Sequence, residues 1–371
     1  MTAVPETRFD LPDELTATEP AEHRGLARDG VRLLVAGSSG ITHSTFSRLD
    51  EHLVPGDLMV VNTSQTVPAE IDGVRSDGWP TVLHIATELD DGSWVVELRT
   101  APYADKPILD GRAGEVIRLS HAERIRLLEP YPAPGGSPTG RGSRLWRVQV
   151  ISSRPLSAYL SRHGRPISYG YLSGQWQLAD YQTIFGKDPG SAEMPSAGRP
   201  FSAELVLRLI TAGITIAPIT LHTGVSSQVA GEPPQAERFT VPAVTARLAN
   251  SAKRAGSRVI AVGTTVTRAL ESAVTEDGSV QASGGWTDLV LGPQHPVRVV
   301  TGLITGLHNP DASHLLLVES VAGAELAQRA YDAAVAERYL WHEFGDSCLL
   351  LPRGASGPGS TGRGTLSFRR S

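Results

Sequence analysis

The stretch Arg258-Val259-Ile260-Ala261-Val262-Gly263-Thr264-Thr265 predicts a buried strand that ends at a glycine, directly before a helix over about 266–273. Similar units precede it in the chain. A helix is predicted over Ser202–Ala212, with its first residue as the cap, and an apolar strand over Ile214–Leu221 follows it. A proline opens a further helix at Pro242. Helices that alternate with strands are typical of an α/β domain.

The same alternation is expected on both sides of a long interruption. The run Gly56–Asn62 predicts an earlier strand of this domain. Later strands are predicted at Asp288–Leu291, Val297–Val300 and Leu315–Glu319, and a last helix at Glu325–Arg338. The large α/β domain is therefore expected to be discontinuous, with residues 1–67 and 156–352 in one unit.

The interruption, residues 68–155, is predicted to be a small inserted all-β domain. Short β-rich runs alternate there with turns. A long β excursion of one larger sheet is the alternative that these residues leave open. The tail, 353–371, is rich in Gly and Ser and is expected to be disordered. The predicted strands of the insert are Val82–Glu88, Trp94–Thr100, Glu115–Leu119, Arg124–Leu128 and Leu145–Val150.

Composition excludes several classes of protein. The 371 residues include 34 Lys and Arg against 39 Asp and Glu, a net charge of −5, which argues against sequence-independent coating of nucleic acid. The single cysteine, Cys348, allows no disulfide within the chain and no cysteine-built metal site, and its apolar neighbours predict a core position. No apolar run approaches the roughly 20 residues of a membrane span, and Met1–Asp10 lacks the pattern of a signal peptide. We expect a cytoplasmic protein that needs no metal.

The helix start after Gly263 is the first candidate binding site. Open α/β folds bind ligands at such strand ends, and helix-start amides favour carboxylate or phosphate. Gly263 permits close backbone approach, and Arg268 lies one turn into the helix. The alternative is structural: Thr264 or Thr265 is an ordinary N-cap, and Arg268 forms a surface pair with Glu271.

Two further regions contain candidate site residues. Tyr181–Thr183 and Pro195–Ser202 combine an aromatic ring with small residues and hydroxyls, which suits a polar ligand, although an ordinary loop before a helix cap has the same composition. His308 and His222 each follow an apolar strand and are candidate proton carriers. A structural histidine is the alternative for both.

Six motifs lie in order along the chain: Arg8–Pro12, Pro55–Leu58, Tyr181–Thr183, Val262–Thr265, Thr305–Pro310 and Tyr339–Asp346. Each is weak alone, and together they span nearly the whole sequence. In this order they resemble the motifs of the S-adenosylmethionine:tRNA ribosyltransferase-isomerase family. The resemblance implies an α/β-barrel-like large domain with a small inserted β-barrel.

The resemblance also implies a reaction of queuosine biosynthesis. In this family the ribosyl group of S-adenosylmethionine moves to the aminomethyl group of 7-aminomethyl-7-deazaguanine in the tRNA anticodon loop. It isomerises there to give epoxyqueuosine, with release of adenine and methionine. The implied co-substrate is S-adenosylmethionine, the implied partner is tRNA, and we expect a monomer without metal or membrane contact.

By resemblance, two sets of residues are assigned to the site. His222, Glu237 and His308 are the candidate catalytic residues. The candidate residues for binding S-adenosylmethionine are Tyr181, Gln182, Thr183, Ser196, Gly198, Gly263, Thr264, Thr265 and Arg268.

Departures from the family pattern put the substrate in question. The family's Asn-Asp-Thr-Arg-Val-Ile-Pro-Ala-Arg is Asn62–Glu70 here, with one acid and two arginines lost. A family histidine is replaced by Pro200, and most of the His-rich segment is altered at 222–237. Two alternatives therefore remain open. One is a divergent transferase that uses S-adenosylmethionine on another amine or nucleoside, and the other is a non-catalytic nucleoside- or RNA-binding protein.

Overall fold

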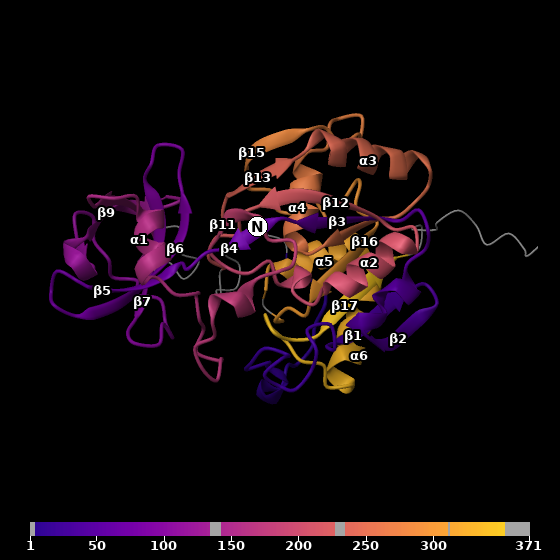
Figure 1. Ribbon diagram of the computed structural model, residues 1–371, viewed down its shortest axis with the longest axis horizontal. Coiled ribbons are helices and arrows are strands. Elements are labelled where there is room, and N and C mark those ends of the chain that lie inside the picture. Colours follow the sequence, from indigo (N-terminus) through magenta and orange to yellow (C-terminus); the bar gives the residue numbers. More distant parts are fainter. Residues whose placement is uncertain (1–3, 134–141, 227–233, 311, 353–371) are drawn as a thin grey trace, which may run out of the picture.

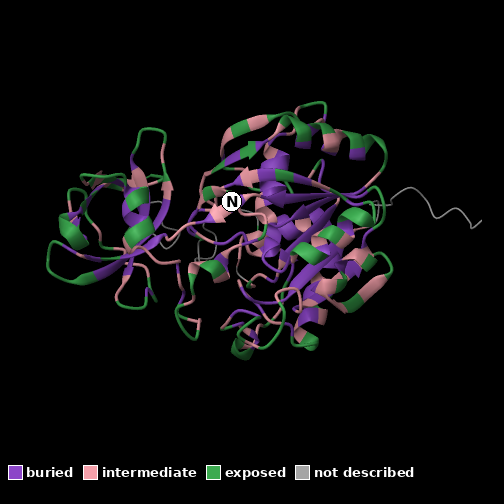
Figure 2. Ribbon diagram, viewed as in Figure 1, coloured by how far each residue is buried: buried purple, intermediate pink, exposed green. Residues whose placement is uncertain are grey.

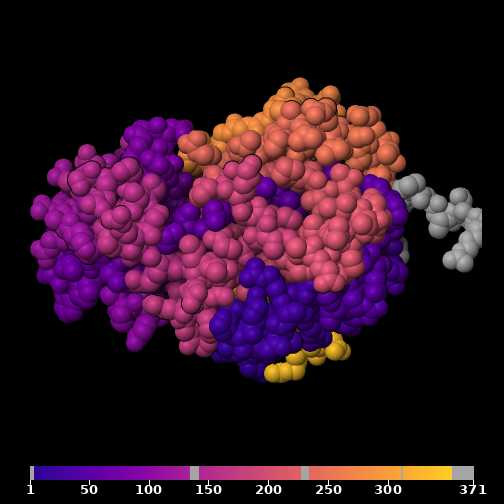
Figure 3. Space-filling view, in the orientation of Figure 1, coloured from indigo at the N-terminus to yellow at the C-terminus, as the bar shows by residue number. Residues whose placement is uncertain are grey.

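The protein has two parts, an α/β body and a β-barrel that projects from it (Figure 1). The structure is a computed structural model that describes residues 4–133, 142–226, 234–310 and 312–352. In the space-filling view the barrel forms a separate lobe beside the larger body (Figure 3). The predicted disordered tail, 353–371, lies outside the described residues.

The body is built on one large sheet, which has nine strands within the described residues. Neighbouring strands β12, β3, β14 and β16 are parallel, so their carboxyl ends lie at one edge. Strands β3 and β14 are buried along their whole length, which is why both are almost entirely apolar. In spatial order the strands are β15 (Ser283–Thr287), β13 (Glu237–Val241), β12 (Thr215–Leu221), β3 (Leu58–Asn62), β14 (Val259–Val262), β16 (Gly302–Gly306), β17 (Ser347–Leu351), β1 (Arg32–Gly37) and β2 (Gly40–Thr45).

Helices cover both faces of this sheet, and the buried residues concentrate between the layers (Figure 2). One face packs against α3 (Ala243–Arg254), α4 (Thr264–Ser272), α5 (His314–Ala322) and α6 (Ala324–Ala336). The other face packs against α2 (Ala203–Thr211) and the 3-10 segment η2 (Phe46–His52). Further 3-10 turns are η1 (Asp13–Leu15), η3 (Ser120–Ala122), η4 (Leu178–Tyr181) and η5 (Ser196–Gly198).

The inserted part is a closed barrel with the strand order β10-β7-β6-β5-β8-β9. Closure leaves the barrel without an open sheet edge. Helix α1 (Leu156–His163) packs on the barrel, because Leu156, Tyr159 and Leu160 belong to the barrel's own apolar cluster. The strands are β5 (Glu70–Val74), β6 (Pro80–Glu88), β7 (Trp94–Thr100), β8 (Val116–Arg118), β9 (Arg124–Tyr131) and β10 (Leu145–Ile151).

Two short strands form the neck between barrel and body (Figure 1). β4 (Ser64–Thr66) leaves the body directly after β3, and β11 (Asp188–Ser191) belongs to the returning segment. They pair in parallel, with Ser64 opposite Asp188. The neck therefore places the barrel next to the carboxyl ends of the parallel strands.

The predicted fold class, an α/β protein with an α/β-barrel-like large domain and an inserted small β-barrel, is confirmed for the mixed α/β body and for the closed inserted barrel. The large sheet itself is open, with β15 and β2 at its two edges. The alternative of one continuous larger sheet is wrong, because the inserted strands close on themselves. All five predicted strands of the insert are present, together with β5, which the sequence reading missed. Ser202 accepts a hydrogen bond from the Leu205 amide as the predicted cap of α2, and Cys348 is buried. The domain limits at 67/68 and 155/156 stay predictions.

Three predicted strands are wrong. Leu315–Glu319 lies in helix α5, whose residues are apolar on most sides because the helix is almost wholly buried. Asp288–Leu291 and Val297–Val300 are not strands, since β15 ends at Thr287 and β16 begins at Gly302. The amides of Val299 and Val300 donate to the Glu271 carboxylate, and the carbonyl of Leu289 accepts from Arg268. Side chains thus satisfy backbone groups that a strand would have paired.

A buried ion pair joins the start of β3 to the start of β14. Arg258 donates to both oxygens of Asp57, and Asp57 also accepts from the Val54 amide at 2.8 Å. Asp57 is 1% exposed and Arg258 8% exposed. Loss of one partner of such a pair leaves an uncompensated buried charge.

We expect Arg258→Ala to lower the free energy of unfolding by about 3–5 kcal/mol, because Asp57 would lose its partner while buried. Urea unfolding followed by circular dichroism measures this loss. Arg254→Ala, at the exposed end of α3, is the matched control. A loss no larger than that of the control would contradict the assignment.

Candidate functional site

A cavity of about 540 Å³ lies at the carboxyl ends of the parallel strands, on the side of the barrel. Its walls come from the segments that follow β12, β14 and β16, and from residues between the barrel and the neck. This is the edge at which open α/β sheets bind ligands. The predicted site residues that line it are Ser196, Glu237, Gly263, Thr264, Thr265, Arg268 and His308.

Gly263 shapes the floor of the cavity. It has φ +97°, which an L side chain rarely adopts, and a Cβ there would lie 3.3 Å from the Cβ of Ala197. It is also the N-cap of α4, with no side chain bonded to the first amides of the helix. The alternative in which Thr264 or Thr265 caps the helix is therefore wrong. Both threonines instead line the cavity at the helix start.

Arg268 fixes the wall of the cavity rather than pairing with Glu271. Its Nη1 donates to the Glu237 carboxylate, and its other donors bind the carbonyls of Leu289 at 3.1 Å, Thr287 at 3.1 Å and Gln235 at 3.2 Å. The predicted surface pair is wrong, because both Arg268 and Glu271 are buried and Glu271 accepts from backbone amides. Arg268 thus holds together two loops and one carboxylate.

Glu237 occupies the same wall at the start of β13. Besides Arg268, it accepts from the Gly224 amide at 3.0 Å. Burial raises the pKa of the Glu237 carboxyl above its ordinary value, although the Arg268 guanidinium opposes the rise. A raised pKa makes a carboxylate a stronger base, which suits a group that removes a proton.

His308 also lines the cavity and stacks on His314. The ring centroids are 4.9 Å apart with an angle of 5°. Burial holds the pKa of His308 well below 6.5, and burial lowers that of His314 to about 4. Nε2 of His308 is 3.0 Å from the Thr305 hydroxyl. At neutral pH both rings are uncharged and present a hydrogen-bonding edge.

The remaining predicted residues do not line the cavity. Tyr181 packs on Phe344 with ring centroids 5.2 Å apart, and Gln182 bonds the backbone of Thr66 with both its amide atoms. Thr183 is buried beside Gly198, where an added Cβ would lie 3.4 Å from Thr183. These residues position the neck and the loop before α2.

His222 also lies at the neck. Its Nδ1 is 2.7 Å from the Ser64 hydroxyl, and its ring covers Gly190, where an added Cβ would lie 2.5 Å from Nδ1. Burial lowers the pKa of His222. The catalytic role assigned to His222 by resemblance stays a prediction, and the contacts that the structure gives it are with neck residues.

Asn62, which the sequence analysis did not single out, connects the neck to the cavity. Its Oδ1 accepts from the amides of Ser64 and Leu221, each at 3.0 Å. Its Nδ2 donates to the Leu221 carbonyl at 2.8 Å and to the Thr265 hydroxyl at 3.3 Å. An amide has two donors and one doubly accepting oxygen, so all of its hydrogen-bonding capacity is used. The sequence feature that could have identified Asn62 is a polar residue at the end of an otherwise apolar strand.

A second missed group forms the wall nearest the barrel: Tyr169, Tyr171, Glu193, His342 and Glu343. Tyr171 stacks on His342 with centroids 4.4 Å apart and on Tyr169 at 6.0 Å. The Tyr169 hydroxyl donates to Glu193. We call this group the acid–aromatic wall. It comes from the segment after α1, from the segment after β11 and from the segment before β17, so no local pattern of sequence marked it.

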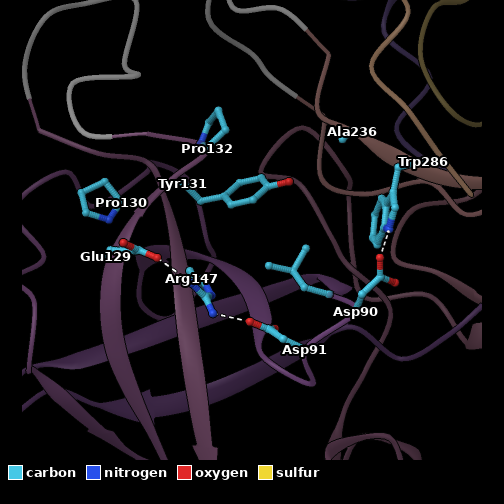
Figure 4. Close-up of a pocket in the computed structure, with 10 residues that line it drawn as sticks. Asp90, Asp91, Glu129, Pro130, Tyr131, Pro132, Arg147, Ala236 and Trp286 are labelled. Carbon is cyan, nitrogen blue, oxygen red and sulfur yellow. Dashed lines mark hydrogen bonds and ion pairs between the residues drawn. The ribbon is translucent and has the colours of Figure 1, made fainter.

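A smaller hollow of about 490 Å³ lies outside this cavity, between the barrel and the outer strands of the body (Figure 4). Asp90 of the β6–β7 turn reaches across it, accepts from Nε1 of Trp286 at 2.9 Å and pairs with Arg238. Asp91 and Glu129 bind Arg147 on the barrel side. The hollow contains none of the predicted site residues, and its contacts brace the barrel against β13 and β15.

Two features are absent from the described residues. None of the helices in the described ranges is long and apolar enough to cross a membrane. Among the same residues, no group of three or more His, Cys, Asp and Glu side chains is placed to hold a metal ion.

Comparison with known proteins identifies the relatives of this chain. The family model described as "Queuosine biosynthesis protein" matches residues 4–350. The chain belongs to this family. The S-adenosylmethionine:tRNA ribosyltransferase-isomerase of Trichlorobacter lovleyi is 31% identical over 94% of this chain and 99% of its own length. That of Symbiobacterium thermophilum is 34% identical over 92% of this chain and 98% of its own.

A solved structure is similar as well. The crystal structure of S-adenosylmethionine tRNA ribosyltransferase from Thermotoga maritima matches with a TM-score of 0.50 and 28% identity, covering 92% of this chain and 99% of that chain. The resemblance inferred from the six motifs is thus confirmed at the level of the queuosine biosynthesis family.

We expect Asn62→Ala to lower the free energy of unfolding by at least about 2 kcal/mol, because the buried backbone groups of Ser64 and Leu221 would lose their partners. Chemical denaturation measures the loss. Thr265→Val, which removes only the hydroxyl that Nδ2 of Asn62 contacts at 3.3 Å and leaves both accepted amides in place, should lose less. Equal losses in both variants would contradict a role based on acceptance from the two amides.

Arg268→Ala should be destabilising in a pH-dependent way. The buried Glu237 would lose its cation, so its already raised pKa would rise further and its ionised form would be penalised. A raised carboxyl pKa makes its contribution to stability largest at low pH and smaller as pH rises through the folded value. We expect a loss of about 3–5 kcal/mol at pH 8 and a smaller loss at pH 5.

Urea unfolding at the two pH values checks this expectation. Glu237→Gln combined with Arg268→Ala should remove most of the pH dependence. The idea fails if the single variant Arg268→Ala is destabilised equally at both values.

Proposed function

We propose that this chain catalyses the reaction for which its relatives are named, with S-adenosylmethionine as ribosyl donor and tRNA as acceptor. The observation that supports this most strongly is that the chain is similar to the enzymes of Trichlorobacter lovleyi and Symbiobacterium thermophilum along nearly their full length. Its cavity also lies at the edge of the sheet where such folds bind ligands. The group transferred is the ribosyl moiety, and it isomerises on the aminomethyl group of 7-aminomethyl-7-deazaguanine to give epoxyqueuosine. Adenine and methionine are released.

The cavity residues suit the parts of this reaction. The start of α4, at Gly263–Thr265, offers backbone amides to a carboxylate such as that of the methionine moiety. Glu237 has a raised pKa and is the candidate base for an acidic proton beside the sulfonium. His308 is neutral and is a hydrogen-bond partner for a ribose hydroxyl.

The partners follow from the same proposal. A tRNA substrate implies a cytoplasmic enzyme that receives the anticodon loop between the body and the barrel. The monomeric state expected from the sequence is part of this proposal. A base of the loop has to leave its stack to enter a cavity of this size.

A turnover assay tests the function. Purified protein is mixed with S-adenosylmethionine and with tRNA that carries 7-aminomethyl-7-deazaguanine, and adenine release and the mass of the modified nucleoside are followed. We expect adenine release that depends on the tRNA, and an epoxyqueuosine product. Unmodified tRNA of the same sequence is the control.

Two other results would overturn the proposal in different ways. Adenine release that does not require tRNA would indicate a transferase with another acceptor. Binding of S-adenosylmethionine without turnover would indicate a non-catalytic binding protein.

A further inference from the structure

The acid–aromatic wall has a carboxyl group that its surroundings leave without a partner. Oε2 of Glu343 is buried and has no hydrogen-bond partner within the described residues, although Glu343 lines the cavity. Burial and the nearby charge of Glu193 raise the pKa of Glu343 to about 8. At neutral pH this side chain is therefore mostly a carboxylic acid. It offers one O–H donor and one carbonyl acceptor side by side.

The titratable groups around Glu343 come from three segments. Glu193 follows β11, and its charge acts on Glu343. The charge of Glu343 in turn raises the pKa values of Tyr171 and Tyr181, together with their burial. His342 adjoins Glu343 in the chain, and burial lowers its pKa, so its ring is neutral. Tyr169 donates to Glu193 and keeps that carboxylate in place.

His342 is the last of three stacked rings. Tyr171 stacks on both His342 and Tyr169, and the Arg99 guanidinium lies over the Tyr169 ring at 5.7 Å. In the described part of the chain no other ring stacks on His342. His342 also has φ +73°, a conformation that non-glycine residues rarely adopt and that persists where the surroundings impose it. The ring of His342 is thus held at the cavity, beside the acid of Glu343.

A planar ring and an adjacent carboxylic acid fit one kind of nucleobase edge. Adenine has an amino donor next to a ring-nitrogen acceptor, which matches the acceptor and donor of a protonated carboxyl group. A guanine-like edge has two adjacent N–H donors and would instead require a carboxylate. The protonation of Glu343 therefore favours adenine over the deazaguanine as the base bound here.

We propose that His342 and Glu343 form the adenine subsite of the cavity, and that Glu343 donates a proton to adenine as it leaves. In this step the bond between the ribosyl carbon and the adenine nitrogen breaks, and its electron pair stays on adenine. A lone pair of the ribose ring oxygen fills the vacancy at the ribosyl carbon by forming a carbon–oxygen double bond. The proton of Glu343 moves to an adenine ring nitrogen, and a Glu343 carboxylate remains. That carboxylate takes a proton from water after adenine departs. The proton transfer rests on the proposed function, whereas the binding of adenine does not.

Adenine binding tests the subsite directly. Free adenine is titrated into the whole protein by calorimetry across a range of pH. We expect the affinity of the wild type to fall roughly tenfold for each pH unit above about 8, as the acid form is lost. Glu343→Gln retains a donor and an acceptor, so it should bind adenine with nearly the same affinity and without this pH dependence. Glu276→Gln, which lies on the surface outside the cavity, is the matched control.

Stacking on His342 is tested in the same titration. His342→Ala should weaken adenine binding by about 5- to 100-fold, the range of a lost base–aromatic stack, while His342→Phe should retain most of the affinity. Circular dichroism and thermal unfolding establish that each variant is folded. Equal affinity in the Ala and Phe variants would overturn the role of the ring.

Turnover then separates binding from proton transfer. An amide cannot give up a proton as a carboxylic acid does, so Glu343→Gln should lower kcat about 100-fold or more while adenine affinity is retained. Failure of the wild type to bind adenine, or the same pH dependence in the wild type and Glu343→Gln, would overturn the subsite. If adenine binds as expected but no tRNA-dependent product forms, the proposed function is wrong, whereas the adenine subsite is still supported.

Discussion

The buried amide of Asn62 is the interaction on which the arrangement of the two parts depends. It lies where β3 ends and the chain leaves for the barrel, and it binds β4, the end of β12 and the start of α4 at once. A buried amide with every donor and acceptor satisfied is rigid, because any displacement leaves a polar group without a partner. The direction of the neck and the position of Thr265 in the cavity are therefore set together.

The two sides of the cavity differ in how their polar groups are satisfied. On the side of α4, Arg268 and Glu237 use their hydrogen-bonding groups on each other and on backbone atoms of neighbouring loops. That side is therefore fixed before a ligand enters. If Arg268 or Glu237 turned towards a ligand, it would lose hydrogen bonds to the protein. On the side of the acid–aromatic wall, Oε2 of Glu343 has no such partner within the described residues. A cavity that combines a preorganised wall with an unsatisfied acid is an arrangement that a ligand completes.

The sequence predicted the elements with strong local patterns. The strand before Gly263, the Ser202 cap and the alternating runs of the insert depend on neighbours in the chain, and the structure contains all of them. It did not predict helix α5, because a short apolar run in a buried helix has no polar face to distinguish it from a strand. The strands predicted at 288–291 and 297–300 were wrong for another reason. The side chains that satisfy their backbone groups, Arg268 and Glu271, lie about 20 to 30 residues away in the chain.

The same division applies to the site. Gly263–Thr265 and Arg268 could be named from a strand end and the helix that follows it, and Glu237 from the resemblance to the family. All of them line one cavity. The role of Arg268 as a clamp on three carbonyls required the loop positions, which only the tertiary structure supplies. Glu343 and Glu193 are separated by 150 residues of chain, and the raised pKa of Glu343 arises from their proximity and from burial together. Its acid form is therefore a property of the assembled cavity. Chemistry that needs a neutral carboxyl at neutral pH can arise only after the segment that follows β11 and the segment that precedes β17 have packed together.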